Sequence, residues 1–153
     1  MKLDTTRFGE IEVEEDKIVR FPQGIPGFEH CRDFIFLQPP NAQIPVWFMQ
    51  SIEDGALAFM VMNPFLVFPD YTIDLPDSVQ EELDIRTEED VMTVAIITIS
   101  ERKEMTLNLL APVILNQRTR TAKQVVLHNS GYQTKHAVNL QEIAATGGRR
   151  GDL

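Results

Sequence analysis

Cysteine is almost absent from this chain of 153 residues, with Cys31 as its single representative. An internal disulfide is therefore excluded, which is typical of a protein from a reducing compartment. The N-terminal stretch MKLDTTRFGEIEVEED carries charges where a signal peptide has its apolar core. No run approaches the ~18 apolar residues of a membrane-spanning helix. We expect a cytoplasmic protein that does not enter a membrane.

Basic residues are scarce in the first part of the chain. Residues 1–90 hold 6 Lys and Arg against 19 Asp and Glu, a balance of −13, whereas residues 91–153 hold 8 against 4, a balance of +4. Such an acidic body repels phosphate backbones, so we expect no direct binding to nucleic acid. The surface suits a basic protein partner drawn in by long-range electrostatics, although an acidic surface can also serve solubility alone.

The motifs of common enzymes are missing too. There is no G-x-S-x-G elbow, no phosphate-cradling glycine loop and no H-E-x-x-H. His30, His128 and His136 lack the clustered spacing of a zinc site. Cys31 follows His30, but neighbours on a strand point to opposite faces and would not form a nucleophile–base pair there. We expect no catalytic residue, metal or cofactor; the competing hypothesis is a small β-barrel enzyme of unknown type that uses carboxylates in the barrel mouth.

What the chain does contain is a series of short apolar runs separated by turn residues. Alternation around Ile11 and Val13 predicts a half-buried strand, with residues 17–21 as the returning strand after an acidic turn. Further strands are predicted at 32–37, at 46–51, at 56–62 after the turn Glu53-Asp54-Gly55, and at 91–99 after a cap-like turn at 87–90. We expect a mainly β fold, a small antiparallel β-barrel-like single domain over residues 1–139. A short helical turn and a disordered tail are expected at 140–153.

One short α-helix is predicted near residues 77–84. Asp77 or Ser78 can serve as its N-cap, because a Gln or Glu follows three residues later, as in a capping box. Val79 and Leu83 would form its apolar face. The helix is short and would be marginal alone, so the sheet must hold it in place.

The longest patterned stretch runs from Met105 to His128. Its apolar arms, 105–115 and 124–127, flank a polar turn and predict a β-hairpin. The turn has no glycine, so Asn116 is the residue best able to adopt a left-handed conformation there. Pro112 lacks a backbone N–H and should lie at an edge, at a bulge or at a bend where the strand changes partner.

A second patterned stretch is the loop from Phe21 to Glu29, FPQGIPGFE. Gly24 and Gly27 can supply positive φ, and the two prolines fix φ at about −65°. The loop is therefore shaped rather than flexible. Its apolar residues allow two interpretations, a loop folded back on the core or a rigid recognition loop that exposes an apolar side chain.

Taken together, these two stretches resemble the FliW family of bacterial flagellar assembly factors. The family patterns are F-P-x-G-[LI]-P-G-F-E, then N-L-x-A-P-[IV]-x-[IV]-N, then [GA]-[KR]-Q-[VI]-[VI]-L; Ala122 stands where Gly is commoner. The residues that carry the resemblance are Phe21, Pro22, Gly24, Ile25, Pro26, Gly27, Phe28, Glu29, Asn108, Leu109, Ala111, Pro112, Val113, Leu115, Asn116, Ala122, Lys123, Gln124, Val125, Val126 and Leu127. The resemblance covers residues 1–138 and leaves out the tail.

The resemblance implies a small β-barrel-like regulator that is not an enzyme and acts through two protein partners. One is flagellin, which the family binds in the cytoplasm before export. The other is CsrA, a dimeric RNA-binding protein that represses translation of the flagellin message. Once flagellin is secreted, free FliW binds CsrA away from its RNA surface and relieves the repression allosterically.

Two groups of residues are candidates for these contacts. A protein that holds RNA carries basic groups, so we expect CsrA to meet an acidic face. Its members are Glu81, Glu82, Glu88, Glu89 and Asp90. Flagellin termini are amphipathic and unfolded before assembly, which suits docking at a strand edge or apolar groove. For that contact the candidates are Ile25 and Phe28 of the shaped loop.

Overall fold

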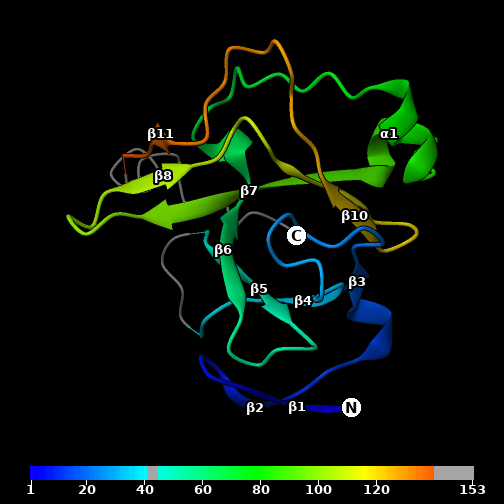
Figure 1. Cartoon of the computed structure of the whole chain (residues 1–153), viewed down its shortest axis with the longest axis vertical. Helices are drawn as coiled ribbons and strands as arrows, with labels where there is room; N and C mark the ends of the chain where they lie inside the picture. The colour runs from blue at the N-terminus through cyan, green and yellow to red at the C-terminus, as the bar shows by residue number, and fades with distance from the viewer. Residues whose placement is uncertain (41–44, 140–153) are drawn as a thin grey trace.

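The computed structural model describes residues 1–40 and 45–139, and this part of the chain is mainly β (Figure 1). The strands are β1 Lys2–Thr5, β2 Gly9–Glu12, β3 Val19–Arg20, β4 Asp33–Leu37, β5 Trp47–Ser51, β6 Ala58–Met62, β7 Val91–Ile99, β8 Met105–Leu107, β9 Val113–Asn116, β10 Thr121–Gln124 and β11 His136–Ala137. The helical elements are the α-helix α1 Asp77–Glu82 and the 3₁₀ turns η1 Glu15–Lys17, η2 Pro64–Leu66 and η3 Glu88–Asp90.

Seven of the strands close into a ring. Hydrogen-bonded neighbours follow the order β7-β6-β5-β4-β3-β10-β9, and β9 pairs back onto β7. All these pairs are antiparallel except β3 with β10, which meet in parallel at Arg20 and Thr121. The predicted small antiparallel β-barrel-like fold is therefore confirmed, with one parallel contact as the exception.

The N-terminal strands form a separate hairpin outside the ring. β1 pairs with β2, from Lys2 opposite Glu12 to Thr5 opposite Gly9, and Figure 1 shows the pair in dark blue at one end of the molecule. The prediction that residues 17–21 return onto this strand is wrong. The η1 turn redirects the chain, and β3 then pairs with β4 and β10 instead.

The interior of the ring is filled by apolar side chains. Its buried members are Val19, Phe21, Ile25, Cys31, Phe34, Met49, Val61, Val94, Val113, Leu115 and Ala122. Eight of the eleven come from the strands of the ring, where successive residues point to opposite faces. The other three, Phe21, Ile25 and Cys31, come from the loop between β3 and β4. We call this cluster the inner core.

A second apolar cluster, the outer core, lies on the other face of β7 and β9. Val94 belongs to the inner core and Ala95 to the outer one, and Val113 and Ile114 divide in the same way. The segment from η2 to α1 covers this face. The prediction that residues 91–99 form a strand buried on both faces is confirmed for its middle, whereas its last two residues are exposed.

The α-helix is shorter than expected and is capped differently. Val79 and Leu83 face the outer core as predicted, with exposed fractions of 6% and 2%. The N-cap, however, is Pro76 rather than Asp77 or Ser78, and the backbone N–H of Val79 donates to the Pro76 carbonyl. Proline fits this position because its fixed φ, here −57°, directs the chain into the first turn.

The hairpin predicted within Met105 to His128 is confirmed, since β9 and β10 pair antiparallel across the polar turn. Its first arm is broken into β8 and β9, and its second strand lies at 121–124 rather than at the predicted 124–127. β8 pairs with β7 and β11, whereas β9 pairs with β7 and β10, so Pro112 lies at a bend where the chain changes one of its partners, as predicted. The prediction for Asn116 is wrong. It ends β9 in a buried position, and Arg120 takes the left-handed conformation with φ 58°.

No helix in residues 1–40 and 45–139 is long and apolar enough to cross a membrane. The helical turn predicted at 140–145 and the tail after it lie outside the described residues.

Candidate partner-binding surface

The predicted acidic residues come together on one surface, which we call the α1 ledge and define as residues 77–90. Glu81, Glu88 and Glu89 are exposed, and none of the three pairs with a cation among the described residues. Glu82 and Asp90 are engaged within the fold instead. Of these five predicted carboxylates, three are therefore free, and the other two belong to the support of the ledge.

Asn116 anchors the C-terminal end of α1 from the sheet. Its side chain is fully buried and donates from Nδ2 to the carbonyls of Leu83, at 2.7 Å, and Asp84, at 3.0 Å. Its Oδ1 accepts from the backbone N–H of Arg118 at 2.9 Å. Asp84 is held at φ 51°, a left-handed conformation that a non-glycine residue adopts only with support. This residue of the family pattern therefore shapes the ledge from inside.

Arg118 holds the two ends of the ledge together. Its Nη2 lies 3.1 Å from Asp84 Oδ2, and its Nε lies 3.6 Å from Asp90 Oδ1. The hydrogen bond from Arg118 lowers the pKa of Asp84. The pKa of Asp90 is lowered first by the backbone N–H of Arg86, which donates to Asp90 Oδ2 at 2.9 Å, and further by Thr87 and Arg118. Both carboxylates are therefore stabilised in the charged form.

The shaped loop is locked by its glycines and by Glu29. Gly24 has φ 70°, and a Cβ there would lie 2.7 Å from the Glu29 Cα, so no other residue fits without a shift. Gly27 has φ 88°, and its N–H donates to the Glu29 carboxylate at 3.0 Å. Backbone pairing between Ile25 and Phe28 closes the turn.

The loop carries one buried and one partly exposed candidate. Ile25 is 2% exposed and packs in the inner core with Phe21, so its side chain supports the loop from within. Phe28 is 36% exposed, and its ring meets Phe59 edge-on at 5.2 Å between centroids. Of the two, Phe28 is the one that exposes apolar surface.

The loop and the hairpin meet on the ledge. Lys123 Nζ donates to Glu82 Oε2 at 2.7 Å, and the Gln23 amide donates to the other oxygen of the same carboxylate. Glu82 therefore joins both stretches of the family pattern to α1. The sequence gives no sign of this convergence, because Gln23 stands at a variable position of the loop pattern.

Other residues of the family pattern stabilise the bend around Pro112. Asn108 Oδ1 accepts from the Ala111 N–H at 3.0 Å, and Gln124 Nε2 donates to the Ala111 carbonyl at 3.1 Å. The Leu109 carbonyl, from a residue that is 1% exposed, accepts from the Tyr71 hydroxyl at 2.6 Å. These contacts replace the ladder that a continuous strand would have supplied.

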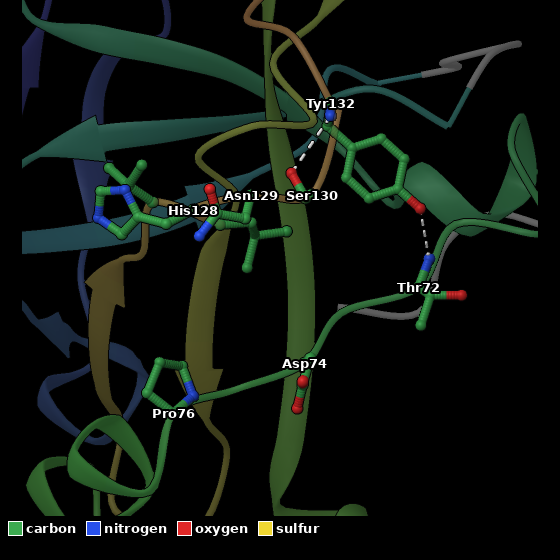
Figure 2. Close-up of a pocket in the computed structure, with 9 residues that line it drawn as sticks. Thr72, Asp74, Pro76, His128, Asn129, Ser130 and Tyr132 are labelled. Carbon is green, nitrogen blue, oxygen red and sulfur yellow. Dashed lines mark hydrogen bonds between the residues drawn. The ribbon is translucent and has the colours of Figure 1, made fainter.

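A groove of about 470 Å³ lies beyond the N-terminal end of α1 (Figure 2). The extended segment 72–76 forms one wall and the segment 126–132 forms the other. The walls are joined where the Thr72 N–H donates to the Tyr132 hydroxyl at 2.9 Å. Sequence analysis missed this groove, because the contact links residues that are 60 positions apart.

Two features among the described residues would support the enzyme hypothesis, a metal-binding cluster and a carboxyl group of raised pKa. In this part of the chain, no three His, Cys, Asp or Glu residues gather as a metal site would require. The carboxyl groups with shifted pKa, Asp84 and Asp90, have lowered values, whereas a general acid would need a raised one. No observation on the described residues favours the enzyme hypothesis.

Comparison with known proteins gives a consistent result. The family model described as "FliW protein" matches residues 2–138. The flagellar assembly factor FliW of Alkaliphilus metalliredigens is 43% identical over 144 residues, covering 94% of this chain and 88% of the relative. That of Bacillus subtilis is 42% identical over 139 residues, covering 90% and 96%.

A solved structure agrees with these relatives. The structure described as "Crystal structure of the flagellar assembly factor FliW" superposes with a TM-score of 0.83 at 42% sequence identity, covering 90% of this chain and 96% of that one. The matches span nearly the whole length of each relative, and they contain both stretches in which the resemblance was first seen. This chain belongs to the FliW family.

Proposed function

We propose that this protein is a cytoplasmic flagellar assembly factor that binds flagellin and CsrA and relieves the repression of flagellin translation by CsrA. The observation that carries the proposal is that both stretches of the family pattern meet at Glu82 and support an acidic surface. Its relatives carry the name flagellar assembly factor. The role needs surfaces for proteins rather than a reaction centre.

The charge on the ledge supports a basic partner. Glu81, Glu88 and Glu89 belong to a segment whose backbone is held by Asn116 and Arg118, so the backbone needs no rearrangement before contact. Such a surface accelerates association with a basic protein. Once bound, it reduces the positive electrostatic potential with which that protein attracts RNA. We assign CsrA to the ledge on this ground.

The matched test is a pair of triple variants. Glu81→Lys, Glu88→Lys and Glu89→Lys together should slow association with CsrA by about tenfold at low salt, with less effect at high salt. The control variant makes the same change in net charge at Glu14, Glu101 and Glu104, which are exposed elsewhere. Association rates that respond equally to both variants would place CsrA away from the ledge.

For flagellin, we propose that Phe28 contributes an exposed apolar contact. The rigid turn around it fixes the direction of the ring, and its edge-on contact with Phe59 leaves part of the ring in solvent. Phe28→Ala should weaken flagellin binding, whereas Phe65→Ala, which removes a ring that is 39% exposed elsewhere, should not. If Phe28→Ala lowers thermal stability and leaves flagellin affinity unchanged, the loop is structural only.

The whole proposal has one direct test. The purified protein is mixed with purified CsrA and, separately, with purified flagellin, and each mixture is resolved by size exclusion. We expect a complex with each partner. Absence of both complexes would contradict the proposed function.

A further inference from the structure

A second hollow, of about 370 Å³, is lined by residues that come from both sides of α1 in the sequence. Residues 73–75 belong to the segment before the helix, and residues 85–88 belong to the segment after it. Gln80 of the helix joins the two segments. Its Nε2 donates to the Leu75 carbonyl at 3.0 Å, and its own carbonyl accepts from the Ile85 N–H at 2.8 Å. We call this cavity the Gln80 hollow, and hydrogen bonds within the fold support its shape.

The Gln80 hollow has an aliphatic lining. Ile73, Leu75, Ile85 and Val91 line it, and each of them packs against the outer core. All four are only partly buried, so aliphatic surface remains in contact with solvent. Such surface favours an occupant that carries methylene groups.

Carboxylates line the hollow from both segments. Asp74 and Glu88 are exposed, and neither forms an ion pair with another described residue. Of the described residues that line the hollow, Arg86 alone is a cation, and its Nη2 lies 3.4 Å from Asp84 Oδ2. The charge of Arg86 is therefore shared with a carboxylate outside the lining, and the two lining carboxylates stay free.

A long basic side chain suits both properties of the hollow. Lys and Arg lay their methylene stems on apolar surface and keep the charged head in water. A purely apolar side chain would leave the two carboxylates unused, and a small inorganic cation would have no use for the aliphatic lining. The charge and the lining together therefore favour an amphipathic cation.

We propose that the Gln80 hollow binds one Lys or Arg side chain of CsrA, with its stem on the aliphatic lining and its charged head at Asp74 and Glu88. This inference rests on the proposed function, because it takes CsrA as the basic partner of the ledge. CsrA is chosen over flagellin because Glu88 belongs both to the hollow and to the free carboxylates of the ledge. The hollow gives the contact a specific anchor in addition to long-range attraction between charges.

Substitution at Asp74 tests the charged part of this contact. Asp74 lies outside the ledge and pairs with no cation among the described residues, so Asp74→Asn should leave the fold intact. It should weaken the complex with purified CsrA by about fivefold in calorimetric titration, near the upper end for an exposed ion pair. The control Asp16→Asn makes the same change of charge on the exposed turn η1 and should leave the affinity unchanged.

Nuclear magnetic resonance of the same complex tests the aliphatic part without a substitution in this chain. The methyl groups of Ile73, Leu75 and Ile85 should show nuclear Overhauser contacts with the side-chain methylenes of one Lys or Arg of CsrA. Replacing that CsrA residue by Met keeps an unbranched stem and removes the charge, so it should weaken the complex about as much as Asp74→Asn. The two changes together should weaken it by less than the product of their separate effects, because they remove one interaction.

The outcomes separate this inference from the proposed function. If the complex forms but these methyl groups contact an apolar side chain of CsrA, no side chain of CsrA, or Arg86 of this chain, the hollow proposal is wrong while the function stands. Equal losses of affinity in Asp74→Asn and Asp16→Asn would mean that net charge alone matters, and would overturn it too. If no complex with CsrA forms by size exclusion, the assignment of CsrA to the ledge and the hollow proposal are both contradicted.

Discussion

The inner and outer cores share β7 and β9 but are enclosed in different ways. The inner core is walled by paired strands all the way round. The outer core is covered by residues 63–90, which contain the six residues of α1 and two 3₁₀ turns. Strand pairing fixes the first wall through backbone hydrogen bonds between strands, whereas the backbone hydrogen bonds of the cover are mostly local ones within its own turns and helix.

Individual side chains hold the cover in place instead. The Tyr71 hydroxyl reaches the Leu109 carbonyl, the Asn116 amide reaches the Leu83 carbonyl, and Arg118 bridges the ends of the ledge. All the free carboxylates of the ledge and one wall of the groove belong to this cover. The comparison teaches that the candidate docking surfaces can be altered locally while the ring stays closed.

The largest expected loss of stability comes from truncating one buried side chain in each core. Phe34→Ala removes a fully buried ring that packs against Phe21 at 5.2 Å and should lower the free energy of unfolding by about 4 kcal/mol. Leu83→Ala should lower it by about 3 kcal/mol. Urea denaturation measures both values. Hydrogen exchange should quicken throughout the ring in the first variant and over residues 77–90 in the second; the same pattern in both would mean that the two cores unfold as one unit.

The next effect tests whether single polar contacts hold the cover. Asn116→Ala leaves the buried Leu83 carbonyl without its donor, whereas the Asp84 carbonyl keeps its hydrogen bond from Arg118, and the change should cost about 2 kcal/mol. Asn108→Ala, which removes one acceptor for the Ala111 N–H, should cost about 1 kcal/mol and spare α1. Thermal denaturation gives the stability change, and exchange of the α1 amides shows whether the loss is local. Equal losses would argue against a special role for Asn116.

The smallest expected effect on stability is seen only at low pH. The pKa values of Asp84 and Asp90 in the folded protein lie below the ordinary value of 3.8, so their contribution to stability is complete above that value. It is lost as the pH falls below 3.8 through the folded values. Arg118→Met should reduce this acid-dependent loss, chiefly at Asp84, since Asp90 keeps its backbone donors. Urea midpoints measured from pH 5 to pH 2 should therefore converge for the two proteins, and Arg102→Met should follow the parent curve.

Much of the ring could be predicted because most of its strands have a local sequence pattern, although β10 lies at 121–124 and was expected at 124–127. The two apolar runs on either side of Gly55 correctly predicted β5, β6 and the turn between them. The apolar stretch at 91–99 predicted β7 with its exact bounds. The helix was also placed correctly, since Val79 and Leu83 sit four positions apart. These features depend on periodicity and turn composition, which act over a few residues.

The contacts that shape the candidate site could not be predicted in the same way. Asn116 follows an apolar run and precedes polar residues, so local rules favour a left-handed turn position. Its actual place is decided by two carbonyls at the end of α1, 33 and 32 positions earlier in the chain. The groove likewise depends on Tyr132 and Thr72, and no local pattern relates them. At both places, contacts with residues distant in the sequence determine the structure, and local sequence preference does not.

The parallel contact between β3 and β10 joins an early part of the chain to a late one, and this affects when the ring can close during synthesis. The circle closes only where Arg20 meets Thr121, so a nascent chain still held on the ribosome at that point has an open sheet with unpaired edges. The C-terminal hairpin of β9 and β10 must emerge before the first twenty residues acquire their neighbour. In the order of synthesis the ring therefore closes late, and a chain interrupted before residue 121 should expose unpaired strand edges.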